Sequence, residues 1–181
     1  MKKIALISHG CAKNLVDSEL ILGILKENGF EITLDENETD TVIVNTCSFI
    51  CDAERESIHT ILELVQSGKK VIVTGCLAQK HPEELKKEIP EIAAVVGATD
   101  FTKIVKVLKN LDNGFVSEVS EEPNYVYPEK VKRAQITMGA SSYIKIADGC
   151  SYRCGYCVIP YLRGDYHSRK MEDVISEAKE L

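Results

Sequence analysis

Short apolar runs alternate with longer amphipathic segments from the start of the chain to about residue 111. Short apolar runs bounded by turn residues are typical of buried strands, and apolar positions at helical spacing are typical of amphipathic helices. The pattern predicts strands at Lys3–Ser8, Glu31–Leu34, Thr41–Asn45, Val71–Thr74 and Ala93–Val96. It predicts helices at Asn14–Asn28, Asp52–Gln66, Pro82–Ile89 and Asp100–Leu111, with Gly29 and Gly68 as the stops of the first two.

Strands and helices therefore take turns along this part of the chain. Alternation of this kind is typical of an α/β fold, in which right-handed crossovers place helices on both faces of a parallel sheet. The predicted fold class is an open parallel sheet flanked by helices, spanning residues 1–111.

The alternation of apolar runs and amphipathic segments ends after residue 111. Residues 112–133 contain Asn, Gly, Ser, Glu and two prolines without periodicity, which predicts a linker. A second domain is expected over residues 134–181, with strand candidates at Gln135–Met138 and Ser142–Ala147 and a helix beginning at Glu172. That helix reaches the last residue, so we expect this second domain to be truncated.

Composition and charge narrow the classes of protein. The chain has 181 residues, of which 44% are hydrophobic and 28% are charged, an ordinary balance for a globular protein. A formal charge of -6 removes the general electrostatic argument for a partner with a phosphate backbone. Two short basic groups are interpreted as solvated surface; they are Lys130, Lys132 and Arg133, and Arg163, Arg169 and Lys170.

The first residues and the cysteine count bear on the compartment. The apolar run Ile4–Ile7 is too short for a signal peptide, and no stretch approaches the roughly 20 apolar residues of a membrane-spanning helix. We expect a cytoplasmic protein without a membrane partner. In that reducing compartment the seven cysteines favour metal binding or catalysis over a disulfide framework.

Three cysteines follow the strand candidate of the second domain in a short loop. Cys150, Cys154 and Cys157 form the pattern Cys-x3-Cys-x2-Cys, between Gly149 and the start of the last helix. Three thiolates at this spacing can bind three corners of a cubane iron-sulfur cluster and leave the fourth iron open. An open iron can chelate the amino and carboxylate groups of S-adenosylmethionine beside a reducing cluster.

Two other interpretations of this loop compete with an open iron-sulfur cluster. A structural zinc site normally has four ligands in paired short spacings, and only His167 is available as a fourth ligand here. Three unligated core cysteines are the second alternative. The spacing, with Tyr156 directly before the third cysteine, instead resembles the signature of the radical-SAM superfamily.

Three further cysteines each follow a predicted strand. They are Cys11, Cys47 and Cys76. The carboxyl ends of parallel strands share one edge, so these residues should converge and could ligate a second cluster. The alternative is that each is a small buried hydrophobe. Cys51 is interpreted as a non-ligand in the first turn of a helix, and His9 as a hydrogen-bonded structural residue.

With both cysteine sets the chain resembles the radical-SAM methylthiotransferase family, over its N-terminal domain and the opening of its radical-SAM domain. The resemblance implies that residues 134–181 are the truncated start of a partial α/β barrel. The segment Gly-Cys-Ala-Lys-Asn-Leu-Val-Asp-Ser-Glu at residues 10–19 carries much of the resemblance. Supporting segments are Asn45-Thr-Cys-Ser-Phe-Ile, Thr74-Gly-Cys-Leu-Ala-Gln and Cys157-Val-Ile-Pro-Tyr-Leu-Arg-Gly-Asp.

The resemblance implies two 4Fe-4S clusters and S-adenosylmethionine as cofactors. Cys150, Cys154 and Cys157, with Tyr156 beside them, would hold the cluster that generates a 5'-deoxyadenosyl radical from S-adenosylmethionine. Cys11, Cys47 and Cys76 would hold an auxiliary cluster whose bound sulfur is methylated and joined to the substrate. No acid-base pair is expected, because an unactivated C-H bond has no acidic proton.

Within the family, two segments are closer to the RimO type than to the types that modify tRNA: Leu-Val-Asp-Ser-Glu at residues 15–19 and Arg163-Gly-Asp. This resemblance implies methylthiolation at the β-carbon of an aspartate in the twelfth small-subunit ribosomal protein. One alternative is methylthiolation of an adenosine in tRNA. Another is a non-catalytic iron-sulfur scaffold or electron carrier. The electron donor, the sulfur source and the oligomeric state are open at this stage, and little or no turnover is expected from the 181 residues alone.

Overall fold

The computed structural model describes residues 2–136 and 141–181, and its centre is a six-stranded sheet. The strand order is β2-β1-β3-β4-β5-β6, and every neighbouring pair is parallel. The strands are β1 (Lys3–Ser8), β2 (Glu31–Thr33), β3 (Thr41–Thr46), β4 (Lys70–Gly75), β5 (Ala94–Gly97) and β6 (Val116–Glu118). The predicted fold class is confirmed, and the five predicted strands are all present.

The central strand β3 explains how the sheet is stabilised. All six of its residues are buried, and successive side chains enter opposite layers because side chains alternate along a strand. Ile43 packs into the cluster on one face, and Val42 and Val44 pack into the cluster on the other. Both layers are aliphatic, as expected for a parallel sheet that is covered on both sides.

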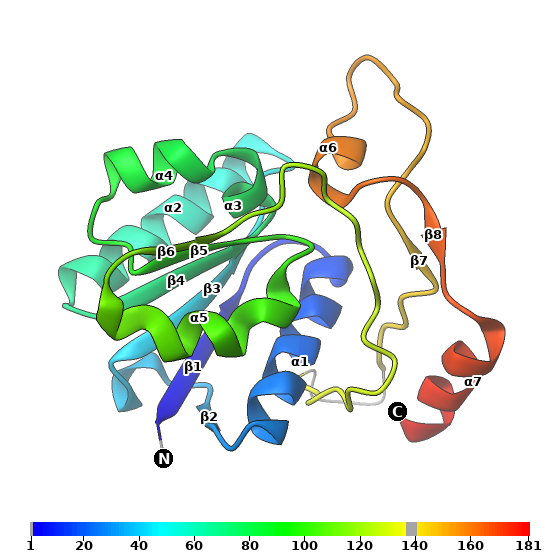
Figure 1. The fold of residues 1–181 in the computed structure, drawn as a ribbon, viewed down its shortest axis with the longest axis horizontal. Coiled ribbons are helices and arrows are strands. Elements are labelled where there is room, and N and C mark those ends of the chain that lie inside the picture. The colour runs from blue at the N-terminus through cyan, green and yellow to red at the C-terminus, as the bar shows by residue number, and fades with distance from the viewer. Residues whose placement is uncertain (1, 137–140) are drawn as a thin grey trace.

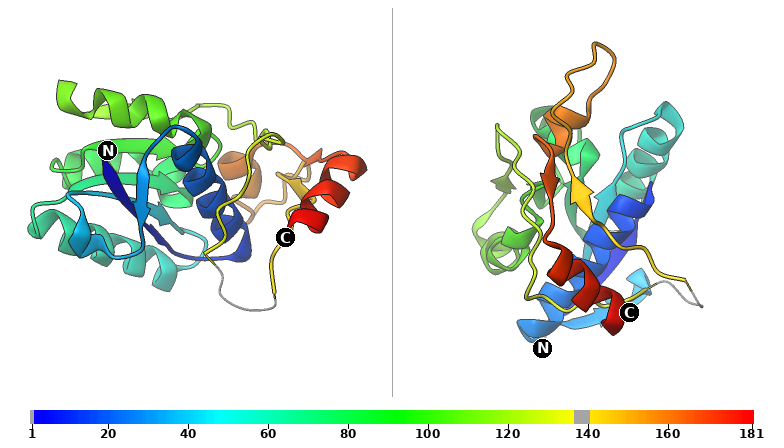
Figure 2. Two further views of the ribbon diagram at one scale, coloured as in Figure 1. Left: turned by 90° about the horizontal axis from the view of Figure 1, so that it is seen from below. Right: turned by 90° about the vertical axis from the view of Figure 1, so that its right-hand side faces the viewer.

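Helices cover both faces of the sheet, as Figures 1 and 2 show. One layer contains α1 (Ala12–Glu27) and α5 (Ile104–Asn110), and the other contains α2 (Cys51–Gln66), α3 (Cys76–Lys80) and α4 (Pro82–Glu88). Three short 3-10 turns complete this part of the chain: Glu36–Glu38, Phe101–Lys103 and Leu111–Asn113. The predicted 100–111 helix is thus shorter than expected, because its first and last turns are wound more tightly.

One strand and one α-helix of this part of the chain were not predicted. The segment 112–133, interpreted as a linker, contributes β6, which pairs with β5 from Ala94 and Val116 to Val96 and Glu118. A run of three residues carries too little periodicity to be recognised as a strand. The five-residue helix α3 begins at Cys76, directly after β4, and was missed for the same reason.

The rest of the segment 112–133 and the C-terminal part of the chain lie beside the carboxyl ends of the strands of the sheet (Figure 1). This part contains β7 (Ala147–Asp148), α6 (Ile159–Arg163), β8 (His167–Ser168) and α7 (Met171–Glu180), and β7 and β8 form an antiparallel pair. The prediction of a strand at Ser142–Ala147 was wrong, because only its last residue joins β7. The candidate strand Gln135–Met138 lies partly outside the described residues, and Gln135 and Ile136 are not in a strand.

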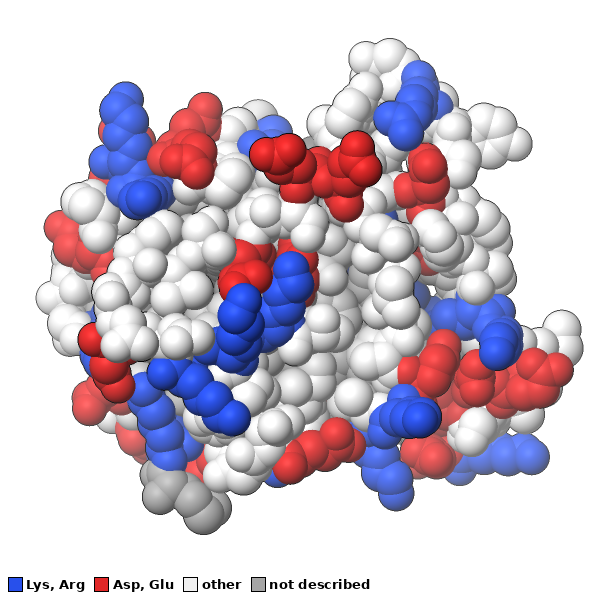
Figure 3. Space-filling model, in the orientation of Figure 1, with Lys and Arg blue, Asp and Glu red and all other residues white. Residues whose placement is uncertain are grey.

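Charged side chains of both signs are interspersed on the face drawn in Figure 3. The interpretation of the two basic groups as solvated surface was wrong for their arginines. Arg133, Arg163 and Arg169 have side chains that are only 3%, 3% and 6% exposed, and each is paired with a carboxylate. Burial of a charge is tolerated when it is paired, and short sequence runs do not reveal the partner.

None of the described helices has the length and apolar character needed to cross a membrane.

Candidate iron-sulfur site

Cys11, Cys47 and Cys76 lie at the carboxyl edge of the sheet, each just beyond a strand. Cys11 precedes the first residue of α1, Cys47 directly follows β3, and Cys76 is the first residue of α3 after β4. The strands are neighbours in the order β1-β3-β4, so the three loops are adjacent. The structure therefore brings these cysteines to one edge, as the sequence predicted.

Two asparagines fasten these loops to one another. Asn14 on α1 donates from Nδ2 to the carbonyls of His9 and Thr46, at 3.1 and 2.8 Å. Asn45 at the end of β3 donates from Nδ2 to the Asn14 carbonyl at 2.9 Å. Because both amides are held by backbone groups, the loops that carry Cys11 and Cys47 have a fixed spacing.

Cys47 is also held by α2. Its backbone N-H donates to Ser57 Oγ at 3.1 Å, and Ser57 Oγ is also 2.8 Å from the Ala53 carbonyl, to which it donates. The neighbouring Ser48 Oγ is the one buried side-chain polar atom without a hydrogen-bond partner among the described residues. An unpaired buried hydroxyl is costly, so this donor is suited to a group that the protein alone does not supply.

Small residues surround the cysteines. A Cβ added at Gly10 would lie 2.6 Å from Cys47 Cβ and 2.9 Å from Cys47 Sγ. A Cβ added at Gly75 would lie 2.3 Å from Asn45 Oδ1, and Gly75 has φ +92°. Only glycine allows these approaches, so the loops crowd together around the thiols.

The thiol of Cys76 is buried and lies next to a cation. Its Sγ is 3.9 Å from Asn14 Oδ1 and 3.9 Å from Arg163 Nη2. Burial raises the pKa of the Cys76 thiol, Arg163 opposes that rise, and the nearby Cys47 and Cys11 add to it. The donor set fits an iron-sulfur cluster, because thiolates are its normal ligands and N-H and O-H donors stabilise its sulfurs.

Among residues 2–136 and 141–181, no group of three or more His, Cys, Asp and Glu side chains could hold one metal ion. A cubane cluster bonds each cysteine to a different iron atom, so its ligands surround a volume instead of meeting at a point. Cys11, Cys47 and Cys76 come from three separate loops. The ligand assignment of these cysteines stays a prediction.

Cys150, Cys154 and Cys157 lie on the loop between β7 and α6, which projects from the molecule in Figure 1. The Cys157 N-H donates to the Cys154 carbonyl at 3.0 Å, and the Cys150 N-H donates to the Gly164 carbonyl at 3.0 Å. Cys154 is exposed, and Tyr156 has 91% of its surface accessible. The three thiols thus share a single open loop, and their role as ligands also stays a prediction.

The remaining sequence candidates have separate positions. Cys51 is exposed as the first residue of α2, as predicted. His9 contacts Thr60 Oγ1 at 3.1 Å, in keeping with a structural histidine. His167 is exposed on β8, with Nδ1 2.9 Å from the Asp165 carbonyl oxygen.

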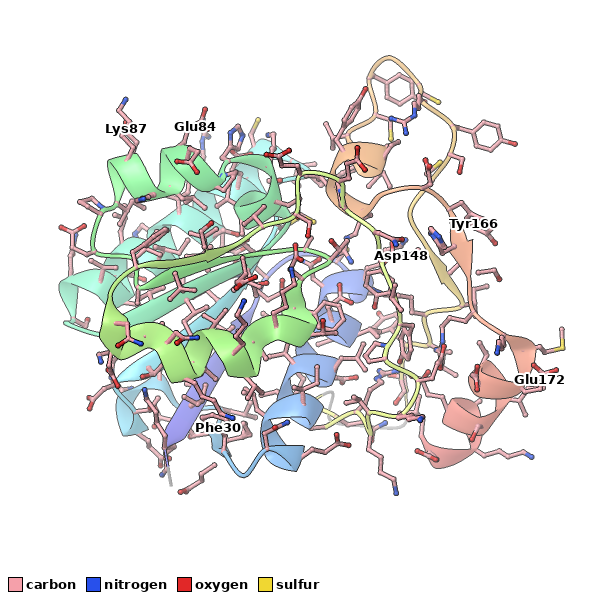
Figure 4. All side chains as sticks on the ribbon, viewed as in Figure 1. Phe30, Glu84, Lys87, Asp148, Tyr166 and Glu172 are labelled. Carbon is pink, nitrogen blue, oxygen red and sulfur yellow. The ribbon has the colours of Figure 1, made fainter. Side chains whose placement is uncertain are left out.

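Sequence reasoning missed a buried ionic network between the sheet domain and the C-terminal part. Asp17 on α1 accepts from Arg163 Nη1 at 2.6 Å and from Lys145 Nζ at 2.6 Å. Asp148 accepts from the same two cations, at 3.1 and 2.9 Å, and from Lys13 at 2.8 Å. Figure 4 shows Asp148 on the side of β7 that faces α1 and the linker, whereas Tyr166 on the loop before β8 points outward. The Asp-Ser-Glu segment at residues 17–19 was the available signal, because it puts two charges between the apolar stretches 15–16 and 20–25 of one helix.

The family model described as "Uncharacterized protein family UPF0004" matches residues 3–97, which is more than half of the chain and includes Cys11, Cys47 and Cys76. The chain belongs to this family. The matched region runs from β1 to the end of β5, so the UPF0004 domain comprises the first five strands of the sheet and the helices between them.

Curated relatives of this UPF0004 protein extend the likeness beyond that domain. The chain is 47% identical over 177 residues to "Ribosomal protein uS12 methylthiotransferase RimO" of Gloeothece citriformis, which covers 97% of the chain and 40% of the relative. Proteins with the same name from Gloeobacter violaceus and Pelotomaculum thermopropionicum are each 47% identical, over 98% and 99% of the chain and 41% of each relative. The chain therefore spans about 40% of the length of these relatives.

Proposed function

We propose that this chain is part of a radical-SAM enzyme that methylthiolates ribosomal protein uS12. One observation carries the proposal: Cys11, Cys47 and Cys76 converge at one edge of the sheet, next to the segment that bears the Cys150–Cys157 loop. The relatives are named as methylthiotransferases of ribosomal protein uS12, which supports this substrate and this reaction. The region of similarity covers 97% of the chain and so spans the segment of the second cysteine set.

In this proposal each cysteine set holds one 4Fe-4S cluster. Cys150, Cys154 and Cys157 would hold the cluster that binds S-adenosylmethionine. When both are bound, the cluster and S-adenosylmethionine together would supply one-electron cleavage of a carbon-sulfur bond. The exposed position of Tyr156 beside the loop leaves it free to contact that cofactor.

Cys11, Cys47 and Cys76 would hold the auxiliary cluster. The chain's own residues then hold the loops of this site in place: Asn14 and Asn45 fasten them by hydrogen bonds, and Ser48 offers a hydroxyl to the ligand shell. Three protein ligands on a four-iron cluster leave one iron for an external sulfur.

We infer that the modified atom is the β-carbon of an aspartate of uS12, as the RimO type implies, and that the reaction takes place where ribosomes are made, in the cytoplasm. The net charge of -6 favours a basic protein partner over tRNA. We also divide the chain into an auxiliary-cluster domain at 1–111, a linking segment at 112–133 and the start of a radical-SAM domain at 134–181.

The substrate is tested in cells. The gene is deleted, and small-subunit ribosomal proteins and tRNA nucleosides from deleted and parental cells are compared by mass spectrometry. We expect the methylthio increment to vanish from uS12 and to return when the intact gene is restored. Loss of a methylthiolated adenosine with unchanged uS12 would contradict the substrate and assign the chemistry to tRNA.

The cluster ligands are tested in the isolated full-length protein. Anaerobic reconstitution should give about eight irons per chain, falling by about four when Cys150, Cys154 and Cys157 are replaced together by Ala. Replacing Cys11, Cys47 and Cys76 together should remove about four different irons. Cys51→Ala is the matched control, because this exposed cysteine lies in the same region and should leave the iron count unchanged. Retention of zinc with no sulfide would refute both assignments.

A further inference from the structure

Arg163 joins the two cysteine-bearing regions. It is the last residue of α6, the helix that follows the Cys150–Cys157 loop, yet its guanidinium lies in the sheet domain. Its Nη2 is 3.9 Å from Cys76 Sγ, and the residue is 2% exposed. A buried N-H donor thus reaches one thiol of the auxiliary site from the segment that follows the other site.

The guanidinium cannot easily turn away from this position. Nη1 donates to Asp17 Oδ2 at 2.6 Å and to Asp148 Oδ2 at 3.1 Å, and Nη2 donates to Asn14 Oδ1 at 2.7 Å. These acceptors come from α1 and from β7, so the orientation is fixed from both sides of the interface. A planar guanidinium with several fixed partners is strongly oriented.

The network around Arg163 carries an excess of positive charge. Three cations, Lys13, Lys145 and Arg163, meet two carboxylates, Asp17 and Asp148, in the ion pairs of this cluster. Three minus two leaves one positive charge, and Arg163 is the member of the network that contacts a cysteine.

A cluster held by thiolates gains negative charge when it accepts an electron. A nearby cation and an N-H donor therefore stabilise the reduced form more than the oxidised form, and the effect is large in a buried site of low dielectric constant. Hydrogen bonds to ligating sulfur and burial are known determinants of cluster potential.

We propose that Arg163 is a positioning residue that presents a positive charge and an N-H donor to the Cys76 thiolate, and thereby raises the reduction potential of the cluster at Cys11, Cys47 and Cys76. Because Arg163 lies six residues after Cys157, it also makes this potential depend on docking of the segment that carries the other cysteine set. The inference rests on the proposed function, since it needs a cluster at the auxiliary site.

The test measures the auxiliary cluster alone. In the full-length protein, Cys150, Cys154 and Cys157 are replaced by Ala, the remaining cluster is reconstituted, and its potential is measured by a redox titration followed by electron paramagnetic resonance. Arg163→Gln is then added to this background. We expect the potential to become more negative by at least the equivalent of a tenfold change in the reduction equilibrium, about 59 mV for one electron.

Arg133→Gln is the matched control. Arg133 has the same 3% side-chain exposure and crosses the same interface, but it pairs with Glu19 and Glu177. A merely structural role would make the two arginine variants equivalent. Arg163→Lys is the second variant: it keeps the charge but not the fork of donors, so its potential should lie between those of the parent and Arg163→Gln.

The outcomes separate the two claims. A background protein that binds no cluster refutes the auxiliary-cluster part of the proposed function, and the inference falls with it. If the background protein binds a cluster, and the potential of that cluster is the same with Arg, Lys or Gln at position 163, the inference alone is refuted. Equal shifts for Arg163→Gln and Arg133→Gln would also overturn it. If Arg163→Gln does not fold, a potential in Arg163→Lys equal to that of the parent overturns the inference, and a more negative one supports it.

Discussion

Asp17 and Arg163 are 146 residues apart in the sequence and form a buried ion pair of 2.6 Å between Oδ2 and Nη1. Burial alone would lower the pKa of Arg163, but Asp17, the Cys76 thiolate and Asp148 outweigh it and keep the pKa well above its ordinary value. The arginine is thus charged at every physiological pH. The pair joins α1 of the sheet domain to the segment after the Cys150–Cys157 loop.

Removal of the Asp17 charge should destabilise the protein strongly. Asp17→Asn leaves Arg163 and Lys145 to share Asp148, and a broken buried pair typically costs about 3–5 kcal/mol. The free energy of unfolding is measured by urea denaturation. Asp52→Asn is the control, because Asp52 is 90% exposed in its pair with Arg55 and should change stability little. Equal effects of the two variants would contradict the buried network.

The network should also shape the acid stability of the protein. Burial alone would raise the pKa of Asp148, but Arg163 and Lys145 hold it far below its ordinary value. A group whose pKa is lower in the folded state stabilises the protein above its unfolded-state pKa, about 3.9 for aspartate, and this contribution is lost as the pH falls toward the folded-state pKa.

Asp148→Asn should therefore lower stability at neutral pH and flatten its dependence on pH below about pH 5. Urea midpoints measured from neutral to acidic pH give this dependence. Glu172→Gln serves as control, because Glu172 is exposed on α7 and points away from the network (Figure 4). The same acid slope in Asp148→Asn and in the parent would show that Asp148 is not held by these cations.

The glycine before Cys76 should be irreplaceable. Gly75 has φ +92° and ψ -158°, a region essentially restricted to glycine, and a Cβ there would also lie 2.5 Å from the Thr46 carbonyl oxygen. Gly114 has a similar backbone conformation, φ +110° and ψ -168°, but no atom within 4 Å of the added Cβ.

Gly114→Ala thus measures backbone strain alone, and Gly75→Ala measures strain plus collision. We expect Gly75→Ala to lose about 1–3 kcal/mol more than Gly114→Ala. It should also lower the iron bound at Cys11, Cys47 and Cys76 after reconstitution, whereas Gly114→Ala should not. Similar stability and iron content in the two variants would count against the crowded loop described at this site.

Tyr125 should contribute through its hydroxyl. It donates to Asp17 Oδ1 at 2.9 Å and accepts from Lys145 Nζ at 3.1 Å. Burial and the charge of Asp17 raise the pKa of Tyr125, so the hydroxyl stays protonated and able to donate. Tyr125→Phe should cost about 1–3 kcal/mol in thermal or urea unfolding. Tyr161→Phe, at a residue 64% exposed, should be nearly neutral, and a neutral Tyr125→Phe would contradict the network.

Much of the sheet domain could be predicted because its information is local. Val71–Val73 and Val42–Val44 are continuous apolar runs, and such runs specify buried strands wherever they pair. The strand-helix alternation then implies parallel order, and parallel order brings Cys11, Cys47 and Cys76 to one edge. The short β6 could not be found, because three residues become a strand only through pairing with β5.

By itself the sequence determined the α/β class, the positions of the principal strands and helices, and the two cysteine patterns, since each depends on local periodicity or spacing. Only the tertiary structure decided that the side chains of Arg133, Arg163 and Arg169 are buried, and that Arg163 meets Asp17 and Cys76. The physical reason is that an ion pair depends on which distant residues the chain folding brings within a few ångströms, and hydrophobic periodicity carries no information about that choice of partner.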